Sequence, residues 1–469
     1  MSHKPDPDKN VNLTINGMSV TVPEGTRILE AAKKVNVDIP TLCEHPDLCR
    51  RGICRICVVE CDGRGKLLTA CTNDVWEGVN VVTHNARLLD VRKTILELIL
   101  ADHPQDCLSC IRNKNCELQA LSESFAIRGN PFDRDFAVQL PEQLREHSSA
   151  ISPKTVENKT LIREMEKCIK CCRCSEVCQE VQTIRAINTS CRSHNFGISV
   201  PYRHTLDEST CVFCGKCASV CPVGAIYGYD QSAEVMEILG KSDRHVIAQV
   251  SEETVTALSS LLCGQKNNSA DNCCTDCIIT AGKITAALKQ IGFKKVYDAQ
   301  AAANVSYSEL KNELEKRKKN GGKLPMISGS WEGISRFIKN FYPELEAHLA
   351  AGKNKRRTFA DAFKYAYIEE EKVYISNVIT VSFVPTVAGK FGDYGKNDYA
   401  LTASELARLI KSAGIDICCL AEEKFDNIKT DTSNQNSYTK PEIINGFPTA
   451  RKVLESVLKS ECISNWIEI

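Results

Sequence analysis

Cysteine spacing is the feature of this sequence that most restricts how the chain can fold. Fifteen of the 26 cysteines, together with one histidine, fall into four closely spaced sets within the first 221 of the 469 residues. Disulfides are typical of small secreted domains, whereas Cys-x-x-Cys runs in a long chain favour metal ligation. The N-terminal half is therefore expected to fold so that each set surrounds a bound metal group.

Residues 11–22, which precede the first set, carry a hairpin pattern. They read as two short strands around Asn16-Gly17, a dipeptide that favours a tight turn between antiparallel strands. Thr26 is then placed to cap a helix that ends near Val35. The sequence predicts a small domain in which a hairpin and a helix support the loop that follows.

The first ligand set lies in that loop and in a later strand. Two irons need four thiolates, and a zinc site is the alternative for the same cysteines. The first interval is longer than in plant-type ferredoxins and resembles that of the 2Fe–2S domains of respiratory complex I and iron-only hydrogenases. The predicted 2Fe–2S ligands, spaced Cys-x10-Cys-x2-Cys-x13-Cys, are Cys43, Cys54, Cys57 and Cys71, and Cys49 and Cys61 are left over as packing thiols.

The second set follows a predicted helix over residues 86–101. The apolar stripe of this helix is expected to be Leu88, Leu89, Val91, Ile95, Leu98 and Ile99. The spacing His-x3-Cys-x2-Cys-x5-Cys also suits zinc. Because it comes directly after the first set, it resembles the His-ligated 4Fe–4S cluster of the same two families. That resemblance implies a cluster held by His103, Cys107, Cys110 and Cys116.

The third and fourth sets repeat the run that is typical of bacterial two-cluster ferredoxins. In this run the fourth cysteine of each copy binds the cluster of the other copy. One 4Fe–4S cluster is thus predicted on Cys168, Cys171, Cys174 and Cys221, and a second on Cys211, Cys214, Cys217 and Cys178. Gln179 stands where a proline is usual, and Cys172 and Cys191 are expected to be spectators.

Beyond about Arg244 the sequence alternates between strand and helix patterns. Such alternation predicts an α/β domain with mostly parallel strands. Strands are expected at HVIAQV, KKVYDA, KLPMIS and VITVSFV, and helices at residues 253–262, 281–291, 306–319, 332–340, 357–368 and 403–412.

The order of the cysteine sets and the segments AGKITAALKQIGFKKVYDA, NGGKLPMISGSWEGISRFIKNFYPEL, VITVSFVPTVAGK and YALTASELARLIKSAGIDI resemble the catalytic subunit of iron-only (FeFe) hydrogenases. The similarity covers roughly residues 10–426. In that family the second half holds the catalytic H-cluster through the motifs TSCCPGW and MPCTAKK and a third, glycine-rich segment with two further cysteines.

This chain departs from each of those motifs. The proton-relay cysteine position is Ser330, and the two cluster-ligand positions are Trp331 and Thr386. Gly389 stands at the position of the catalytic-site lysine, and the third motif is not found. Since Trp and Thr cannot replace a thiolate ligand, we predict that no H-cluster forms and that the chain has no catalytic residue for hydrogen chemistry.

A further cysteine group lies in the segment LLCGQKNNSADNCCTDC. Cys263, Cys273, Cys274 and Cys277 stand within 15 residues, where the hydrogenases that the chain resembles lack cysteines. A fifth iron–sulfur cluster, a zinc ion and no metal at all are the open readings, and Cys418, Cys419 or Cys462 could supply a ligand.

Composition narrows the function classes. Net charge is zero and no polybasic run is present, which argues against nucleic acid and anionic membranes as partners. The polar start MSHKPDPDKN predicts no secretory signal, and VYISNVITVSFV is too short to cross a bilayer. We expect a cytoplasmic protein of a reducing, anaerobic compartment.

Taken together, the predicted fold is a multidomain α+β and α/β chain. Its expected parts are a β-grasp 2Fe–2S ferredoxin domain (1–82), a helical 4Fe–4S domain with one histidine and three cysteine ligands (83–155), a bacterial two-cluster ferredoxin domain (156–240), a degenerate FeFe-hydrogenase-like α/β domain (241–428), and a linker and tail (429–469).

The leading functional hypothesis is an electron-transfer subunit. A hydrogenase-like subunit without its H-cluster resembles the large iron–sulfur subunit of Stn-type transhydrogenases, which couple NAD(H), NADP(H) and ferredoxin by flavin-based electron bifurcation. The implied partners are a complex I-like NADH-dehydrogenase flavoprotein that carries FMN or FAD, a small 2Fe–2S subunit, an NADP-binding FAD subunit and soluble ferredoxin.

Four alternatives stay open at this point. The chain could be an atypical hydrogenase or reductase, a redox-sensing hydrogenase paralogue, or a subunit of another bifurcating complex, for example one with formate dehydrogenase. A membrane complex I subunit shares the first two sets, but the hydrogenase-like stretch from Ala281 to Ile417 argues against it.

Overall fold

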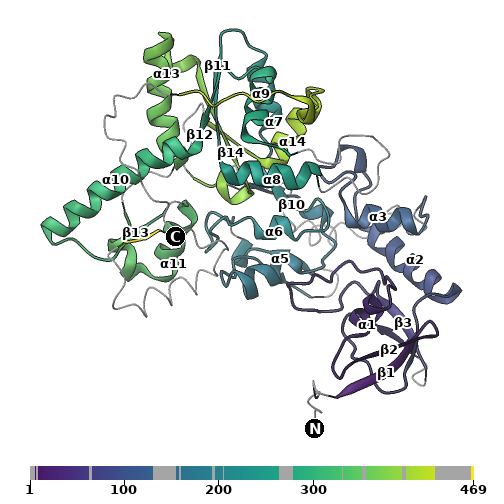
Figure 1. Cartoon of the computed structure of the whole chain (residues 1–469). Coiled ribbons are helices and arrows are strands. Elements are labelled where there is room, and N and C mark those ends of the chain that lie inside the picture. The colour runs from purple at the N-terminus through teal and green to yellow at the C-terminus, as the bar shows by residue number, and fades with distance from the viewer. Residues whose placement is uncertain are drawn as a thin grey trace, which may run out of the picture. The chain divides into compact units, whose positions relative to one another are not determined.

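The computed structural model describes residues 6, 9–62, 66–129, 132, 155–157, 160–192, 196–203, 205–263, 278–329, 331–350, 355–392, 398–427 and 466–468. By its internal contacts the chain divides into two units. Figure 1 labels helices and strands of both. Unit 1 is residues 1–157, 162–209 and 216–227, and unit 2 is residues 158–161, 210–215 and 228–469.

Unit 1 begins with a five-stranded mixed sheet in the order β2-β1-β5-β3-β4. Its elements are β1 (Asn10–Ile15), β2 (Met18–Pro23), α1 (Ile28–Lys34), β3 (Val58–Cys61), β4 (Leu67–Thr69) and β5 (Asn80–Val82). The predicted hairpin is confirmed: β1 and β2 pair antiparallel, and Asn16 and Gly17 both adopt the positive φ that a two-residue turn requires. Alternate residues of β1 (Val11, Leu13 and Ile15) pack with Ile28 and Leu29 in one core.

The start of α1 differs from the prediction by one residue. Arg27, not Thr26, is the N-cap residue, with extended backbone angles and its N–H donating to Glu30 Oε2 at 3.4 Å. The Thr26 hydroxyl instead donates to the carbonyl of Pro23 at 2.6 Å. Arg27 also forms a β-bridge with Asp74. That bridge keeps Arg27 extended and moves the helix start by one position.

Helix α2 (Ala86–Ala101) has the predicted bounds, and the Asn85 side chain caps it by accepting from Leu88 N at 2.8 Å. The predicted apolar stripe is partly wrong. Leu89 and Leu98 are 49% and 52% exposed. The buried face is Leu88, Arg92 and Leu96 instead, at four-residue spacing. Arg92 can lie in this face because its guanidinium donates to the carbonyl of Val58.

The cysteine-rich part of the chain consists of short elements joined by tight loops. They are η1 (Cys107–Ser109), α3 (Glu117–Ser124), β6 (Thr155–Glu157), β7 (Leu161–Arg163), η3 (Met165–Lys167), α5 (Arg173–Glu176), the π-turn η4 (Val177–Val181), β8 (Asn188–Ser190), β9 (Gly197–Ser199), η6 (Pro201–Arg203), α6 (Lys216–Ser219) and β10 (Ile226–Gly228). Strands β10, β7 and β6 form one small sheet, in that order, and β8 and β9 form a hairpin.

Unit 2 is built on a four-stranded sheet in the order β12-β11-β14-β15, and all its pairings are parallel. This confirms the predicted parallel α/β arrangement. The strands are β11 (His245–Val250), β12 (Lys295–Asp298), β14 (Val378–Val384) and β15 (Asp398–Thr402). The helices around them are α7 (Ser232–Leu239), α8 (Glu252–Cys263), α9 (Ala281–Ile291), α10 (Ala299–Asn320) and α14 (Ala403–Ser412).

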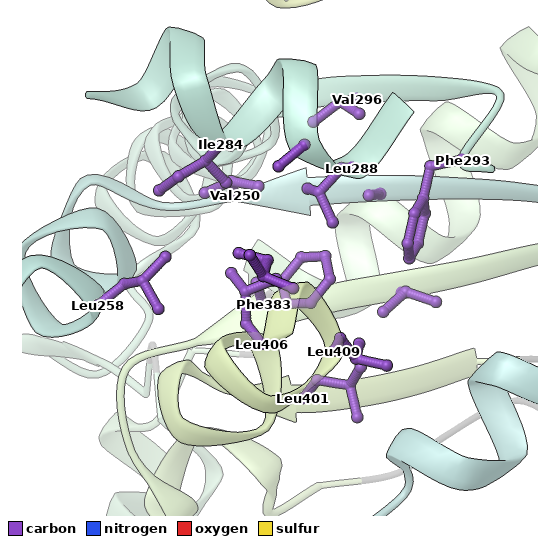
Figure 2. Packing of buried hydrophobic residues seen from close by; sticks show 14 of the residues in the cluster. Val250, Leu258, Ile284, Leu288, Phe293, Val296, Phe383, Leu401, Leu406 and Leu409 are labelled. Carbon is purple, nitrogen blue, oxygen red and sulfur yellow. The ribbon is translucent and has the colours of Figure 1, made fainter. Parts of the chain in front are cut away.

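Both faces of this sheet are covered by helices. On one face Val250, Phe383 and Leu401 from the strands pack with Leu258 of α8 and Leu406 of α14 (Figure 2). On the other face a smaller cluster joins the strands to α10 and to the helical segment over residues 355–371. Because successive residues of a strand point to opposite faces, strands buried on both sides read as continuous apolar runs, as HVIAQV and VITVSFV do.

Three elements of unit 2 differ from their predicted forms. The helix expected at 306–319 begins earlier, as α10, because Asp298 caps it by accepting from Gln300 N at 2.9 Å. The helix expected at 357–368 runs as α12 (Lys355–Thr358), a π-turn η8 (Phe359–Phe363) and α13 (Lys364–Glu371). Strand β13 (Met326–Ser328) is formed as predicted but lies outside the four-stranded sheet, where it pairs with β16 (Trp466–Glu468).

The remaining elements of this unit are α11 (Glu332–Phe341), η7 (Pro343–His348), η9 (Ile375–Asn377), η10 (Val387–Lys390) and η11 (Ile417–Cys419). Among the residues that the structure describes, no helix is both long enough and apolar enough to cross a membrane.

Candidate iron–sulfur sites

The structure brings the four cysteines of the first set together beside the N-terminal sheet. Cys57 Sγ lies 3.3 Å from Cys71 Sγ, and the backbone N–H of Cys54 points to Cys43 Sγ at 3.5 Å. Cys43, Cys57 and Cys71 are buried, with Cys57 beside β3 and Cys71 just after β4. The sheet thus fixes one half of the set, and the loop over residues 42–56 supplies the other.

Contacts within the two pairs of thiols shift their pKa values in opposite directions. The side-chain contact with Cys54 lowers the pKa of Cys43 to about 6, and the side-chain contact with Cys71 lowers the pKa of Cys57 to about 7. The same contacts raise the pKa of Cys54 and Cys71. The thiolate is the form that ligates metal, so each pair contains one thiol that is readily deprotonated near neutral pH.

The second set lies between α2 and α3. His103 follows the end of α2, Cys107 begins η1, and Cys116 caps α3. Burial raises the pKa of Cys116, and electrostatic interaction with the Cys110 and Cys107 thiols raises it further. The three cysteines of this set are therefore close enough to interact with one another.

The third set lines a single cavity in unit 1. Cys168, Cys171 and Cys174 meet Cys221 there, although Cys221 follows 47 residues after Cys174 in the chain. The cavity wall is otherwise mostly apolar and includes Met165, Ile169, Ile198, Val223 and Ile226. The cross-over of the fourth cysteine, which the repeat predicts, is thus the arrangement that the fold produces for this set.

The two ferredoxin-like runs share a local conformation. In the first run Lys170 has positive φ and its N–H donates to Cys168 Sγ at 3.4 Å. In the second run Phe213 has positive φ and its N–H donates to Cys211 Sγ at 3.4 Å. Tight loops that point backbone N–H groups at sulfur suit a negatively charged cluster, because hydrogen bonds to sulfur stabilise it.

The fourth set divides between the two units. Cys211 and Cys214 belong to unit 2, whereas Cys178 and Cys217 belong to unit 1. The fourth cluster therefore stays a prediction. Gln179, the residue in the usual proline position, bonds through its side-chain amide to Ser175 Oγ at 3.1 Å and Asn188 Oδ1 at 2.6 Å. Hydrogen bonds of the Gln179 side chain thus fix this position, where the pyrrolidine ring of a proline would otherwise restrict the backbone.

The cysteines predicted to be spectators have varied surroundings. Cys49 and Cys191 are exposed, and Cys61 lies in the core of the N-terminal sheet. Cys172 is buried, adopts positive φ and lines the same cavity as the third set. Burial raises the pKa of the Cys172 thiol.

One glycine near the sets was not singled out from the sequence. A Cβ at Gly224 would stand 2.8 Å from Cys110 Sγ, closer than two such atoms can approach. Nearby, the N–H of Glu117 donates to the carbonyl of Pro222 at 3.0 Å. The second and third sets are therefore neighbours, since Glu117 follows Cys116 and Pro222 follows Cys221. The local sequence gives no hint of this contact, because it joins segments about 110 residues apart.

In unit 2, the positions that hold the H-cluster in the hydrogenases that the chain resembles are occupied by other side chains. The indole N–H of Trp331 donates to the carbonyl of Ala388 at 3.1 Å. Thr386 caps the short helix η10, and Gly389 packs so tightly on Val384 that a Cβ would stand 2.7 Å from the Val384 Cβ. Ser330 lies outside the described residues.

The lysine that follows Gly389 is the most buried charged group of this region. Lys390 is 1% exposed, and its Nζ donates to Glu405 Oε1 and to the Tyr229 carbonyl, each at 2.6 Å. Glu405 Oε2 in turn accepts from Thr402 Oγ1 at 2.9 Å at the start of α14. Burial lowers the pKa of Lys390 and raises the pKa of Glu405, and each partner opposes the shift of the other.

The candidate fifth site lies largely outside the described residues. Cys273, Cys274 and Cys277 are not described, and Cys263 is the last residue of α8. Of the cysteines that could supply a further ligand, Cys418 forms a disulfide bond and Cys419 is exposed, with its Sγ 3.2 Å from Asp416 Oδ2. Cys462 is not described.

Four family models match separate parts of the chain. Residues 266–464 match the iron-only hydrogenase large subunit, C-terminal domain. Residues 8–86 match a 2Fe–2S cluster binding domain, residues 92–131 the NADH-ubiquinone oxidoreductase-G iron–sulfur binding region, and residues 204–227 a 4Fe–4S binding domain.

Full-length relatives of the chain include a hydrogenase subunit and a hydrogenase. The NADP-reducing hydrogenase subunit HndD of Solidesulfovibrio fructosivorans is 32% identical over 89% of this chain and 71% of its own length. The chain belongs to the iron-only hydrogenase large-subunit family. Iron hydrogenase 1 of Clostridium pasteurianum is 29% identical to this chain, over 96% of this chain and 74% of the Clostridium protein. The alpha subunit of the NADPH-Fe(3+) oxidoreductase of Geobacter sulfurreducens is 31% identical over 46% of the chain and 24% of its own length.

Solved structures give weaker likenesses. An NAD+-reducing NiFe-hydrogenase has a TM-score of 0.41 at 26% identity, covering 46% of this chain and 87% of that chain. The apo FeFe-hydrogenase of Chlamydomonas reinhardtii has a TM-score of 0.37 at 21% identity, covering 42% of this chain and 51% of that chain.

The residues of the first and third sets fit the clusters predicted for them. The first set forms two close pairs, Cys43 with Cys54 and Cys57 with Cys71, and the four cysteines of the third set line one mostly apolar cavity. In both sets a backbone N–H is directed at sulfur. The buried Nε–H of Arg173, between Cys171 and Cys174, has no hydrogen-bond acceptor within the part of the chain that the structure describes. An unmet buried donor costs roughly 1–3 kcal/mol, and the sulfide of a bound cluster is one group that could accept from it. Among the described residues, no three His, Cys, Asp or Glu side chains converge as ligands of a single metal ion would.

Proposed function

We propose that this chain is the iron–sulfur electron-transfer subunit of a flavin-based electron-bifurcating NAD(P)H/ferredoxin oxidoreductase of the transhydrogenase type. One 2Fe–2S and three 4Fe–4S clusters relay electrons between a partner flavoprotein and ferredoxin. The ligands are the sixteen residues of the four sets. The observation that carries the proposal is the adjacency of the second and third sets in unit 1, through Glu117 and Pro222, in a chain whose H-cluster positions are Trp331 and Thr386.

The residues of unit 1 suit a relay. A bound iron–sulfur cluster accepts and releases single electrons. The chain contributes cysteine ligands that are mostly buried or half-buried, N–H groups that stabilise the negative cluster, and short contacts between neighbouring sets. Closely packed sets need no moving part for an electron to pass from one to the next.

The residues of unit 2 support the absence of hydrogen chemistry. Trp331 stands at one ligand position, and its indole bonds to the loop that carries the other, Thr386. Neither side chain offers a thiolate. We therefore propose that this unit is a scaffold or a docking domain and that it holds no H-cluster.

The names of the similar proteins support a multi-subunit, pyridine-nucleotide-linked setting. HndD is a subunit of an NADP-reducing hydrogenase, and the Geobacter relative is a subunit of an NADPH-dependent oxidoreductase. By analogy we propose a flavoprotein that oxidises or reduces NAD(P)H as the partner, with FMN or FAD on the partner and not on this chain.

Native purification under anaerobic conditions tests the proposal. The tagged chain is expected to bring down a flavoprotein, and the complex is expected to reduce ferredoxin with NAD(P)H. Cys54→Ser should abolish the 2Fe–2S signal and slow this reaction, whereas Cys49→Ser, which changes an exposed cysteine outside the sets, should leave both unchanged. A chain that purifies alone with an activity of its own would contradict the proposal.

Hydrogen evolution is a separate test. The chain co-expressed with H-cluster maturases is expected to evolve no hydrogen with a reduced donor, while a typical family member treated in the same way does. Hydrogen evolution by the pure chain would overturn the proposal that unit 2 holds no H-cluster. The relay proposed for unit 1 would then be tested by the copurification experiment alone.

A further inference from the structure

An ion pair between a buried arginine, Arg173, and a half-exposed glutamate, Glu117, joins the second and third ligand sets. Arg173 stands between Cys171 and Cys174, and its side chain is only 6% exposed. Its Nη1 and Nη2 donate to Glu117 Oε1 and Oε2 at 2.6 and 2.8 Å, a two-pronged contact. Glu117 directly follows Cys116 of the second set. Each member of the pair is therefore within two residues of a predicted cluster ligand in its own set.

The position of Glu117 is fixed from two sides. Its backbone N–H donates to the carbonyl of Pro222, next to Cys221, and its carboxylate holds Arg173. Arg112, which lies between Cys110 and Cys116, donates to the carbonyl of Ala218 at 2.9 Å in the same region. These contacts anchor the ion pair where the two sets meet.

The charge of Arg173 acts on more than Glu117. Its guanidinium interacts electrostatically with the Cys171 thiol of the third set and with the Cys43 thiol of the first. The buried Arg173 guanidinium thus acts on ligands of the third and first sets. Through Glu117 it is also bonded to the residue that follows Cys116 of the second set. A charge shielded from water acts more strongly on its neighbours than an exposed one.

We propose that Arg173, held by Glu117, is a positioning residue that sets the reduction potential of the cluster on Cys168, Cys171, Cys174 and Cys221 relative to its neighbours. This inference rests on the proposed clusters being present. Reduction adds one negative charge to a cluster, so a fixed cation beside it favours the reduced form. Glu117 is the counter-charge that limits this effect.

The two partners therefore have opposite expected effects. Arg173→Gln removes the cation and leaves the carboxylate, so the equilibrium constant for one-electron reduction should fall about tenfold, which is about 59 mV for n = 1. Glu117→Gln leaves the cation without its counter-charge, so the potential should rise. Arg173→Lys keeps the charge and should keep most of the potential, and the double change Arg173→Gln/Glu117→Gln should lie between the single variants. A smaller shift in the same direction is expected for the 2Fe–2S centre, because Arg173 also reaches Cys43.

The test is an EPR-monitored redox titration of the full chain, purified anaerobically, with iron per chain measured for each variant. Arg87→Gln is the matched control, since it removes the arginine of an exposed Arg–Glu pair with Glu60 and should shift no potential. Single variants that shift in the same direction, or that shift less than about threefold at full iron content, overturn the inference. If Arg173→Gln fails to load iron, the other two single variants decide between the readings. A purely structural role of Arg173 predicts that Glu117→Gln does not raise the reduction potential and that Arg173→Lys loses iron. A wild-type chain without iron contradicts the proposed function instead, so the two failures are distinguishable.

Discussion

Removal of the buried cation in unit 2 gives the sharpest stability prediction. Lys390→Met keeps most of the side-chain volume and deletes the charge that Glu405 faces at 2.6 Å. Both side chains are almost fully buried, with 1% and 4% exposure. Breaking a buried ion pair from one side costs about 3–5 kcal/mol, because the remaining charge stays in a dry site without its partner. The free energy of opening around α14 should fall by that amount.

Amide hydrogen exchange in the peptide that covers α14 measures this change within the intact chain. Since each 1.4 kcal/mol is a factor of ten, exchange there should be faster by about 100-fold or more. The α1 peptide in unit 1 serves as the internal reference and should not change. Lys241→Met, which removes one partner of an exposed pair with Glu237, should leave α14 exchange close to that of the wild type.

The second partner provides the cross-check. Glu405→Gln still offers a side-chain oxygen to the start of α14, where Glu405 forms a capping box with Thr402. In Lys390→Met/Glu405→Gln no buried charge is left, so most of the loss should be recovered. If Lys390→Met accelerates α14 exchange by less than about threefold, or if the double variant is worse than Lys390→Met, the reasoning from buried charge is wrong.

The same pair predicts a pH dependence for the variant. Burial raises the pKa of Glu405 above 4.5 even beside Lys390, and Lys390 opposes that rise. In Lys390→Met the opposition is gone, so the folded chain holds the Glu405 proton to higher pH than the unfolded chain does. The unfolded state then loses its proton first as pH increases, and stability falls with rising pH above about 4.5. The penalty of Lys390→Met should be smaller at acidic than at neutral pH, and this difference should vanish in the double variant.

Two further predictions concern the ligand sets. Gly224→Ala should alter or abolish the EPR signal of the His-ligated cluster in the reduced chain, because its new Cβ meets Cys110 Sγ at 2.8 Å. Gly129→Ala, with no atom within 4 Å of its new Cβ, should leave that signal unchanged. An unchanged spectrum for Gly224→Ala would contradict the contact. Cys221→Ser should lower the iron content by about four atoms per chain, whereas Cys172→Ser, although it lines the same cavity, should keep it; equal iron loss in both variants would show that Cys172 is not a spectator.

Much of the fold could be predicted because its signals are local. The Asn16-Gly17 turn, the bounds of α2 and α14, and the parallel sheet all follow from patterns within about 20 residues. The cysteine sets are also local, apart from Cys221 and Cys178, whose crossed places the repeat itself predicts; the structure shows the crossing for Cys221.

The failures share a physical cause, which is contact between distant segments. Arg92 lies on the buried face of α2 only because the carbonyl of Val58 accepts from it, and helical periodicity counts arginine as polar. Thr26 lost the capping position because Arg27 pairs with Asp74. Strand β13 has an apolar pattern that suits any sheet, and the pattern does not specify its partner.

The site itself was predictable in its ligands but not in its surroundings. Spacing identifies which cysteines can bind a cluster, since the ligands of one cluster lie mostly on one loop. The charges and N–H groups that tune a cluster come from other segments, as Glu117 comes to Arg173 from 56 residues away. No motif marks such a pair in the sequence.

The loop over residues 384–390, which replaces the second hydrogenase motif, is held by contacts that need no thiolate ligand. In the hydrogenases that this chain resembles, the loop equivalent to residues 384–390 carries a cluster ligand and a catalytic-site lysine. Here Trp331 bonds to the Ala388 carbonyl, and Lys390 joins the loop to α14 and to Tyr229. These contacts come from the chain's own side chains and backbone, so the loop does not depend on thiolate ligands at positions 331 and 386 for its stability. Unit 2 can therefore keep its fold although Trp331 and Thr386 offer no thiolate.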